Sequence, residues 1–268
     1  SGFDEALVVS YDGIGEIESG LIGTGRGDCL EVVQQGPRFP HSLGLIYSAV
    51  THFLGWKHHC DEGIVMGLAT FGNPYEKMPR GDKTYIGEFR KIIQVVDDFD
   101  YRIDQAFITY HLQRDTWISP KFVENFGAPR IDNGPIEQRH KDIAAALQLR
   151  LEEVVLDQLD RAKQIYEKSR LCLAGGVALN CSMNGKIEQS GLFEEIFVQP
   201  ASGDAGVALG ACLLAQKEHA ISFSSKDLQC AYLGSSASDK EIEGAFKQRS
   251  LSPVKSEDVF NWTAERLA

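Results

Sequence analysis

Two short apolar runs in the second half of the chain constrain its fold most, because a glycine-containing turn and a helix-compatible stretch follow each of them. Residues 171–174 (LCLA) lead into Gly175-Gly176, and residues 196–198 (IFV) lead into a small polar turn that contains Asp204. Glycine lets a backbone approach a ligand closely, and helix N-termini offer free N–H groups and the positive end of a dipole. Two such units suit nucleotide binding, although ordinary turns of an α/β core show the same pattern.

The composition limits the class of protein and its partners. The 268 residues suffice for one large α/β domain or two lobes, and 43% hydrophobic and 24% charged residues are typical of a globular protein. The net charge of −11 argues against nucleic acid or an anionic membrane surface as the main partner. The six cysteines include no CxxC pair, and the chain has no long apolar run and no signal peptide. We therefore expect a reduced, cytoplasmic protein that does not enter a membrane.

The two ends of the chain suggest a fragment of a longer protein. Its first methionine is Met66, it starts almost directly on a strand, and it stops inside an amphipathic stretch at residues 258–268. We expect both ends to be cut.

Hydrophobic periodicity predicts most of the helices and strands. Residues 140–169 form the clearest helix, and Glu152-Glu153 are assigned to its solvent-exposed face. Residues 221–230 read as a linker. The remaining predictions are strands at 6–10, 101–103 and 107–110, an antiparallel meander over 16–24 and 29–34, and helices at 42–56 (capped by Ser42), 61–68 and 238–249.

Asp12 and Asp204 are the candidate catalytic and metal-binding residues. Asp12 stands in an Asp-Gly turn after the first strand, and the order of the three turns is that of the actin-like ATPase fold. In that fold the two carboxylates would face one cleft, where they suit a divalent metal ion that bridges phosphate oxygens. Two alternatives stay open, since Asp12 suits a turn and Asp204 suits a helix N-cap.

Five segments, in this order, resemble the NodU/CmcH/TobZ family of O-carbamoyltransferases: ALVVSYDGIGE, SLGLIYSAVTHFLGW, DEGIVMGLATFG, LCLAGGVALNCSMNGKI and QPASGDAGVALGACLLA. The resemblance implies an α/β protein with the actin-like ATPase (ASKHA, Kae1-like) fold, in which helices flank mixed sheets in two lobes. It also implies a Kae1-like carbamoyltransferase domain at 1–222, incomplete at its N-terminus. Residues 223–268 would be a linker and the start of a YrdC-like domain.

The resemblance further implies an activity and its cofactors. The YrdC-like part makes carbamoyl adenylate from ATP and carbamoyl phosphate, and the Kae1-like part passes the carbamoyl group to a hydroxyl of a sugar, antibiotic or other small molecule. The family binds a divalent metal, iron in its best-understood members, through two histidines of an HxxxH motif and two aspartates. Asp12 and Asp204 match the aspartates, and the histidines would precede Ser1. The fragment alone should then be inactive. The protein could form a homodimer, which the sequence does not decide.

Seven further residues are predicted to contact the nucleotide, with Asn180 equally suited to a helix N-cap. They are Gly13, Gly15, Gly175, Gly176, Val177, Asn180 and Gly203. The chain departs from the family where Ile64 replaces a lysine and where Thr70-Phe71 replaces Pro-Tyr.

Other residues attract attention without carrying the prediction. Residues 58–62 (HHCDE) look like a metal site, but adjacent side chains point in different directions, so we expect none there. His41 is expected near the cleft and His52 in packing. Two other functions remain as alternatives: tRNA threonylcarbamoylation by a Kae1/TsaD-like protein, and a nucleotide-binding lobe without catalysis. Acceptor specificity is assigned to residues 75–139 and to parts outside the chain, and the sequence names neither the acceptor nor the metal.

Overall fold

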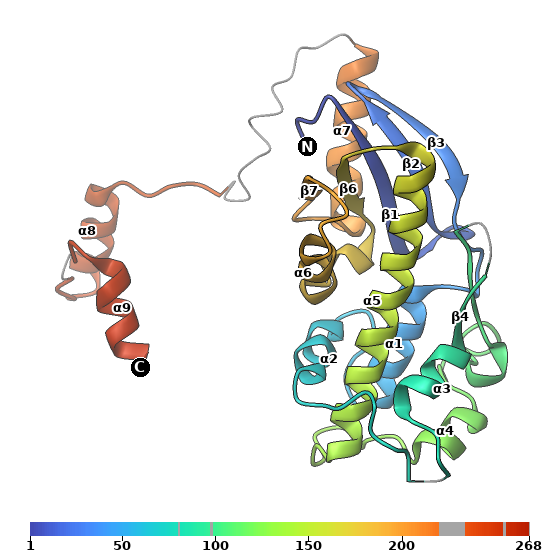
Figure 1. Cartoon of the computed structure of the whole chain (residues 1–268). Coiled ribbons are helices and arrows are strands. Elements are labelled where there is room, and N and C mark those ends of the chain that lie inside the picture. Colours follow the sequence, from blue (N-terminus) through green and yellow to red (C-terminus); the bar gives the residue numbers. More distant parts are fainter. Residues whose placement is uncertain (80, 97–98, 220–233, 254–255, 268) are drawn as a thin grey trace. The chain divides into compact units, whose positions relative to one another are not determined.

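A computed structural model of the chain describes all residues except 80, 97–98, 220–233, 254–255 and 268 (Figure 1). The chain divides into two compact units, Ser1–Leu228 and Gln229–Ala268. The domain boundary predicted between residues 222 and 223 and the linker predicted at 221–230 lie outside the described residues.

A five-stranded mixed sheet organises the first unit, in the order β3-β2-β1-β6-β7. The β1–β2 and β2–β3 pairs are antiparallel, whereas β6 is parallel to both β1 and β7. Parallel neighbours need a crossover, which α6 (Cys181–Gln189) supplies between β6 and β7. The predicted meander and the predicted α/β class are therefore confirmed. The strands are β1 (Glu5–Gly15), β2 (Glu18–Arg26), β3 (Cys29–Gln35), β6 (Arg170–Ala174) and β7 (Glu195–Val198).

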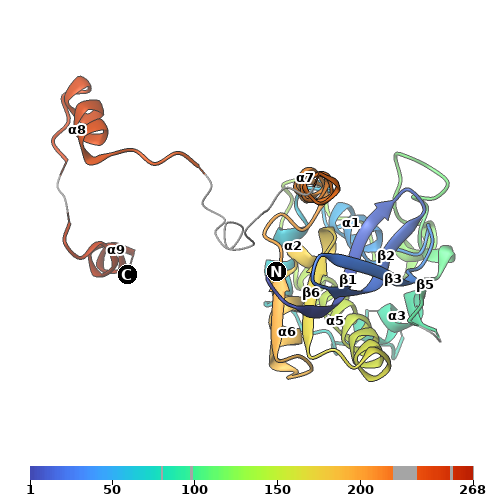
Figure 2. The ribbon, with the colours of Figure 1, turned by 90° about the horizontal axis from the view of Figure 1, so that it is seen from above.

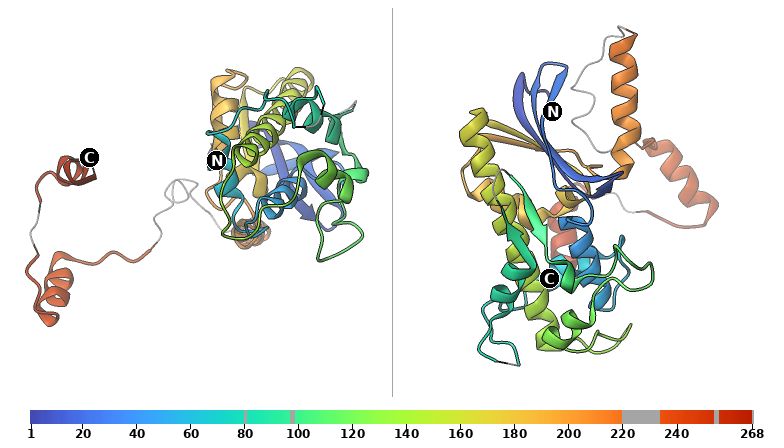
Figure 3. Two further views of the ribbon diagram at one scale, coloured as in Figure 1. Left: turned by 90° about the horizontal axis from the view of Figure 1, so that it is seen from below. Right: turned by 90° about the vertical axis from the view of Figure 1, so that its right-hand side faces the viewer.

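Helices cover the two faces of this sheet unequally. The long helix α5 (Gln138–Tyr166) and α1 (Leu43–Phe53) share one core with Leu7 and Val9 of β1, which are fully buried. Helix α7 (Val207–Glu218) lies across the opposite face from α5 (Figures 2 and 3) and has no buried residue.

Side-chain caps explain where the two core helices begin. The Ser42 hydroxyl accepts a hydrogen bond from the Leu45 amide (3.0 Å), which confirms the predicted cap of α1. Glu137 and His140 form a capping box at the start of α5. Both predicted helices are confirmed, within the usual shift of their ends.

The exposed position predicted for Glu152 is wrong. Its side chain is buried and accepts a hydrogen bond from Gln148 Nε2 (2.7 Å), while Glu153 is ion-paired with Arg90 and Arg150. Tertiary packing explains the difference, because α2 (Glu62–Ala69) and α3 (Tyr85–Ile92) both contact α5 and cover a face that is polar in sequence.

Small elements between α3 and α5 complete the unit. They are β4 (Ile93–Val95) and β5 (Tyr101–Ile103), which form a two-stranded sheet, the 3₁₀ turn η1 (Gln105–Phe107) and α4 (Pro120–Phe126). The strand predicted at 107–110 is wrong. The Asp104 carboxylate accepts a hydrogen bond from the Ala106 amide (2.9 Å) and stabilises the turn, so only Ile108 forms a β-bridge, with Ile118.

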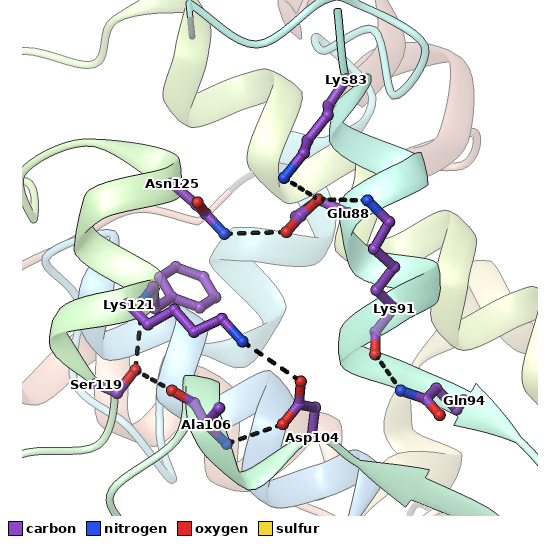
Figure 4. Close-up of polar contacts among 10 residues, drawn as sticks. Lys83, Glu88, Lys91, Gln94, Asp104, Ala106, Ser119, Lys121 and Asn125 are labelled. Atoms are coloured by element: carbon purple, nitrogen blue, oxygen red, sulfur yellow. Dashed lines mark hydrogen bonds and ion pairs between the residues drawn. The ribbon is translucent and has the colours of Figure 1, made fainter. Parts of the chain in front are cut away.

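A buried carboxylate joins α3 to α4 (Figure 4). Glu88 is 2% exposed and lies 3.1 Å from Lys91 Nζ and 3.5 Å from Lys83 Nζ. It also accepts a hydrogen bond from Asn125 Nδ2 of α4 (2.9 Å). Because a buried charge is tolerated only when it is paired, this cluster fixes α4 against α3.

The second unit contains two short helices, α8 (Asp239–Gln248) and α9 (Val259–Leu267). Ser238 and Glu241 form a capping box at the start of α8, so the helix predicted at 238–249 is confirmed. Among the described residues of the whole chain, no helix is both long and apolar enough to cross a membrane.

Candidate functional site

A cavity of about 590 Å³ in the first unit lies where β1, the turn after β6 and the turn after β7 meet helices α1 and α2. Both candidate aspartates line it, although they come from distant parts of the sequence. Five of the seven predicted nucleotide-binding residues line it as well: Gly13, Gly176, Val177, Asn180 and Gly203. The first cavity therefore brings together most of the site that the sequence predicts.

Asp12 lies inside β1 and bonds to two other elements beside the cavity. Its side-chain Oδ1 accepts a hydrogen bond from the Gly176 amide in the turn after β6 (3.0 Å). Its backbone carbonyl accepts one from the hydroxyl of Ser42, the cap of α1 (3.0 Å). The alternative of Asp12 as a turn residue is therefore wrong, because β1 continues to Gly15 and the carboxylate bonds across the sheet.

Asp204 has the opposite character. It is the first residue of the 3₁₀ turn η3 (Asp204–Gly206) that leads into α7, and it is exposed. Neither η3 nor α7 has a side-chain cap hydrogen bond, so the alternative of Asp204 as a helix N-cap is wrong. Its carboxylate lines the cavity without a recorded hydrogen bond among the described residues.

The two adjacent glycines after β6 serve different needs. Gly175 has φ +84°, and a Cβ atom there would lie 2.1 Å from the carbonyl oxygen of Tyr11, so no other residue fits without a shift of the backbone. At Gly176 a Cβ atom would approach Asp12 Oδ1 to 3.1 Å. Gly175 therefore shapes the turn behind the cavity, and Gly15 lies at the end of β1, paired with Glu18.

Asn180 belongs to a polar network under the cavity. Its Oδ1 accepts a hydrogen bond from the Met183 amide (2.9 Å), which confirms the N-cap alternative. Its Nδ2 donates to Gln148 Oε1 (2.9 Å), which also accepts from the Tyr47 hydroxyl (2.9 Å). Burial raises the pKa of Tyr47, and the nearby carboxylates of Glu152 and Glu62 raise it further, so the phenol stays neutral.

Sequence analysis missed the wall formed by α1 and α2. Glu62 Oε1 accepts hydrogen bonds from the Ser48 hydroxyl (2.5 Å) and from the amide of His59 (2.6 Å), which holds His59 at φ +60°. His59, Cys60 and Glu62 line the first cavity, whereas Asp61 lines a second one. The polar residues Tyr47 and Ser48, inside an otherwise apolar helix, were the sequence signal that could have predicted this wall.

The 58–62 segment is only partly divergent, because His59, Cys60 and Glu62 line the first cavity together while Asp61 lines the second. Among the described residues, no group of three His, Cys, Asp or Glu side chains has the arrangement of a metal site. His41 is not in the wall of the first cavity, because its Nδ1 accepts a hydrogen bond from the Ile103 amide (3.1 Å). The packing role predicted for His52 is also wrong, since His52 is exposed and lines the second cavity.

Comparisons with known proteins identify the family. Residues 1–213 match the family model "Carbamoyltransferase N-terminus". The chain is 40% identical to nodulation protein NolO of Bradyrhizobium diazoefficiens, over 81% of this chain and 36% of that protein. It is 38% identical to nodulation protein NolNO of Sinorhizobium fredii, over 91% of this chain and 33% of that protein. The chain therefore belongs to the carbamoyltransferase family.

More distant similarities extend this result. The chain is 27% identical to the 3'-hydroxymethylcephem-O-carbamoyltransferase of Streptomyces clavuligerus, over 66% of this chain and 29% of that enzyme. A crystal structure of HypF from T. kodakarensis matches with a TM-score of 0.40 and 13% identity, over 85% of this chain and 36% of that one, which is too low to support an argument. The chain spans well under half the length of these relatives.

Proposed function

We propose that this chain forms the transfer half of an O-carbamoyltransferase. The group would come from carbamoyl phosphate, be activated with ATP as carbamoyl adenylate, and pass to a hydroxyl of a small-molecule acceptor. One observation carries the proposal: Asp12 and Asp204, chosen from sequence, line the same cavity together with the glycine turns. The named activity of the cephem O-carbamoyltransferase supports the choice of a hydroxyl acceptor.

The sheet supports the proposed actin-like ATPase (ASKHA, Kae1-like) fold. Three antiparallel strands continue into two parallel ones, in the order β3-β2-β1-β6-β7. The end of β1 and the turn after β6 meet at the cavity, where the glycine backbone of both borders the space. This arrangement suits a lobe that binds nucleotide at the ends of its central strands.

The two aspartates fit part of a divalent metal site. Carboxylate oxygens are ligands for hard divalent cations, and Asp204 has no competing hydrogen bond among the described residues. Since the described residues contain no group of three suitable ligands, Asp12 and Asp204 would contribute to a larger ligand set. The metal, which we propose to be Fe²⁺, would stabilise negative charge on the carbamoyl or phosphate oxygens.

The chain's own residues would orient the donor. Gly176 and Gly203 have no side chain, which leaves room in the cavity for a ligand close to the backbone. The network of Tyr47, Gln148 and Asn180 holds the cavity floor in one arrangement. The chain therefore supplies a fixed surface on which a carbamoyl group is held near an acceptor hydroxyl.

Labelled carbamoyl transfer tests the proposal. The protein with its remaining parts would receive labelled carbamoyl phosphate, ATP, Fe²⁺ and a panel of hydroxylated acceptors. We expect transfer, and we expect Asp204→Asn to reduce it by about a hundredfold or more, as loss of an electrostatic contact to the reacting group does. Asp160→Asn, at an exposed position of α5 that does not line the cavity, is the matched control.

Two outcomes would count against the proposal. If nucleotide and metal both bind but no acceptor receives the carbamoyl group, the proposed carbamoyltransferase activity is wrong. If the Asp204→Asn protein turns over at the wild-type rate, Asp204 is not a ligand of the metal.

A further inference from the structure

A second cavity of about 780 Å³ lies at the C-terminal end of α1. The loop after α1 forms one wall, and residues 115–118 together with the loop before α5 form the others. Its volume falls within the usual range for ligand pockets. The residues that matter below are Trp56, Lys57, Asp61, Asp115, Trp117 and Asp132.

Arg130 holds the first aromatic wall in place. Its guanidinium lies 4.5 Å from the centre of the Trp56 ring. The same group donates hydrogen bonds to the carbonyl of Leu54 (2.9 Å) and to that of Gly134 (2.8 and 3.0 Å). The loop before α5 is thus tied to the end of α1, and the indole of Trp56 has a fixed position.

Trp117 forms the second aromatic wall. Its carbonyl accepts a hydrogen bond from the Thr109 amide (3.1 Å), and its ring lies 4.3 Å from that of His58. Ser119, two residues later, caps α4, which the Glu88 cluster fixes to α3 (Figure 4). Both indoles therefore belong to a preformed cavity rather than to loose loops.

Five charged residues line the cavity: Lys57, Asp61, Asp115, Arg130 and Asp132. Asp115 and Asp132 are exposed, and neither has a hydrogen bond or ion pair recorded within the described part of the chain. Asp61 already accepts a hydrogen bond from the Lys57 amide (2.9 Å). Arg130 keeps its positive charge, but backbone carbonyls occupy most of its hydrogen-bond donors.

The two cavities share one wall. His59 lines the first cavity, and its ring lies 5.0 Å from the ring of Trp117, which lines the second. The His58 ring lies beside both, at 5.1 Å from His59. An extended molecule with one end in the first cavity could therefore place its other end against the two indoles.

We propose that the second cavity is a saccharide-binding subsite that holds the acceptor at a distance from its reacting hydroxyl. The C–H face of a sugar ring is apolar and packs on an aromatic ring, while its hydroxyls donate hydrogen bonds to carboxylates. Trp56 and Trp117 supply the rings, and Asp115 and Asp132 supply acceptors without competing partners. The identification of the bound sugar as the acceptor rests on the proposed function, whereas sugar binding itself does not.

Backbone groups, rather than side-chain charge, assign the two substrates to different cavities. The donor and the nucleotide carry phosphate groups, which bind to helix N-termini and glycine turns and to a bridging metal ion. The first cavity offers glycine turns and backbone amides to such anions. The second cavity instead offers a sugar the two indoles and the carboxylates of Asp115 and Asp132.

Tryptophan fluorescence tests the subsite in the chain as it stands. The chain has three tryptophans, so Trp262→Phe leaves only Trp56 and Trp117 as reporters. This variant would be titrated with methyl glucoside, maltose and glucosamine, without donor or metal. We expect a saturable change with at least one sugar, which ATP does not displace.

Variants then locate the binding. Adding Asp115→Asn with Asp132→Asn should weaken the sugar by about tenfold, because carboxylate acceptors become weaker amide ones. Asp160→Asn should leave it unchanged. No response to any of the sugars, or equal affinity in the double variant, would overturn the subsite. Because no turnover is measured, sugar binding with no carbamoyl transfer would reject the proposed function alone.

Discussion

The two faces of the five-stranded sheet differ in how they are covered. On one face, Val154 and Leu159 of α5 are fully buried in the core that contains Leu7 and Val9 of β1. On the other face, α7 has no buried residue, and Val207 and Leu214 are 69% and 65% exposed. A helix that is apolar on most sides is ordinarily buried, so α7 stands out.

The difference extends to the two aspartates of the first cavity. Asp12 comes from β1 in the densely packed body and is fixed by hydrogen bonds to Gly176 and Ser42. Asp204 comes from the turn that leads into α7 and has no such bond among the described residues. The contrast between the two faces of the sheet therefore continues into the cavity.

Truncating one leucine on each side gives the largest contrast. Leu159→Ala leaves a cavity in the core, so we expect the free energy of unfolding to fall by about 3 kcal/mol. Leu214→Ala on α7 removes an exposed side chain and should change it by less than about 0.5 kcal/mol. Urea denaturation of both variants measures the difference, and an equal loss for Leu214→Ala would mean that α7 is covered in solution.

Glycine-to-alanine substitutions in the turn after β6 and in α7 should also differ in their effect on stability. Gly175→Ala adds a Cβ atom against the Tyr11 carbonyl at φ +84°, so we expect a loss of about 2 kcal/mol or more. Gly210→Ala lies in α7, where a Cβ atom meets nothing within 4 Å. That variant should gain about 0.5–1 kcal/mol from helix propensity. Thermal unfolding measures both, and a stable Gly175→Ala protein would contradict the assigned turn geometry.

The smallest effect concerns pH. Burial lowers the pKa of His140 at the start of α5, and it lowers those of His41 and His58. The unfolded chain therefore binds more protons as pH falls below about 6.5, so stability is full above that pH and is lost as pH falls through the lowered pKa values.

Urea midpoints at about pH 7.5 and about pH 5.5 measure this dependence. His140→Gln should narrow the difference between the two midpoints, because one of the three imidazoles with a lowered pKa is gone. His219→Gln, at the exposed C-cap of α7, should leave the difference as in the wild type. A wild-type midpoint that rises on acidification would reverse the sign of the argument.

The sequence predicted most elements because their signals are local. Helix α5 shows apolar residues at helical spacing along its 29 residues. Ser42 predicts the start of α1, because its cap depends only on amides nearby in the sequence. Short apolar runs that end in turns predicted the strands before Gly175 and before Asp204. The strand predicted at 107–110 failed because the cap of Asp104 stabilises a turn there.

Tertiary structure alone decided how these pieces meet. The burial of Glu152 depends on α2 and α3 packing against α5, and the polar network with Gln148 follows from that contact. The wall of His59 and Glu62, and the second cavity with its two indoles, bring together residues that share no local pattern. A sequence records the preferences of neighbours along the chain, whereas a cavity is made by side chains that become neighbours only when the sheet and its helices assemble.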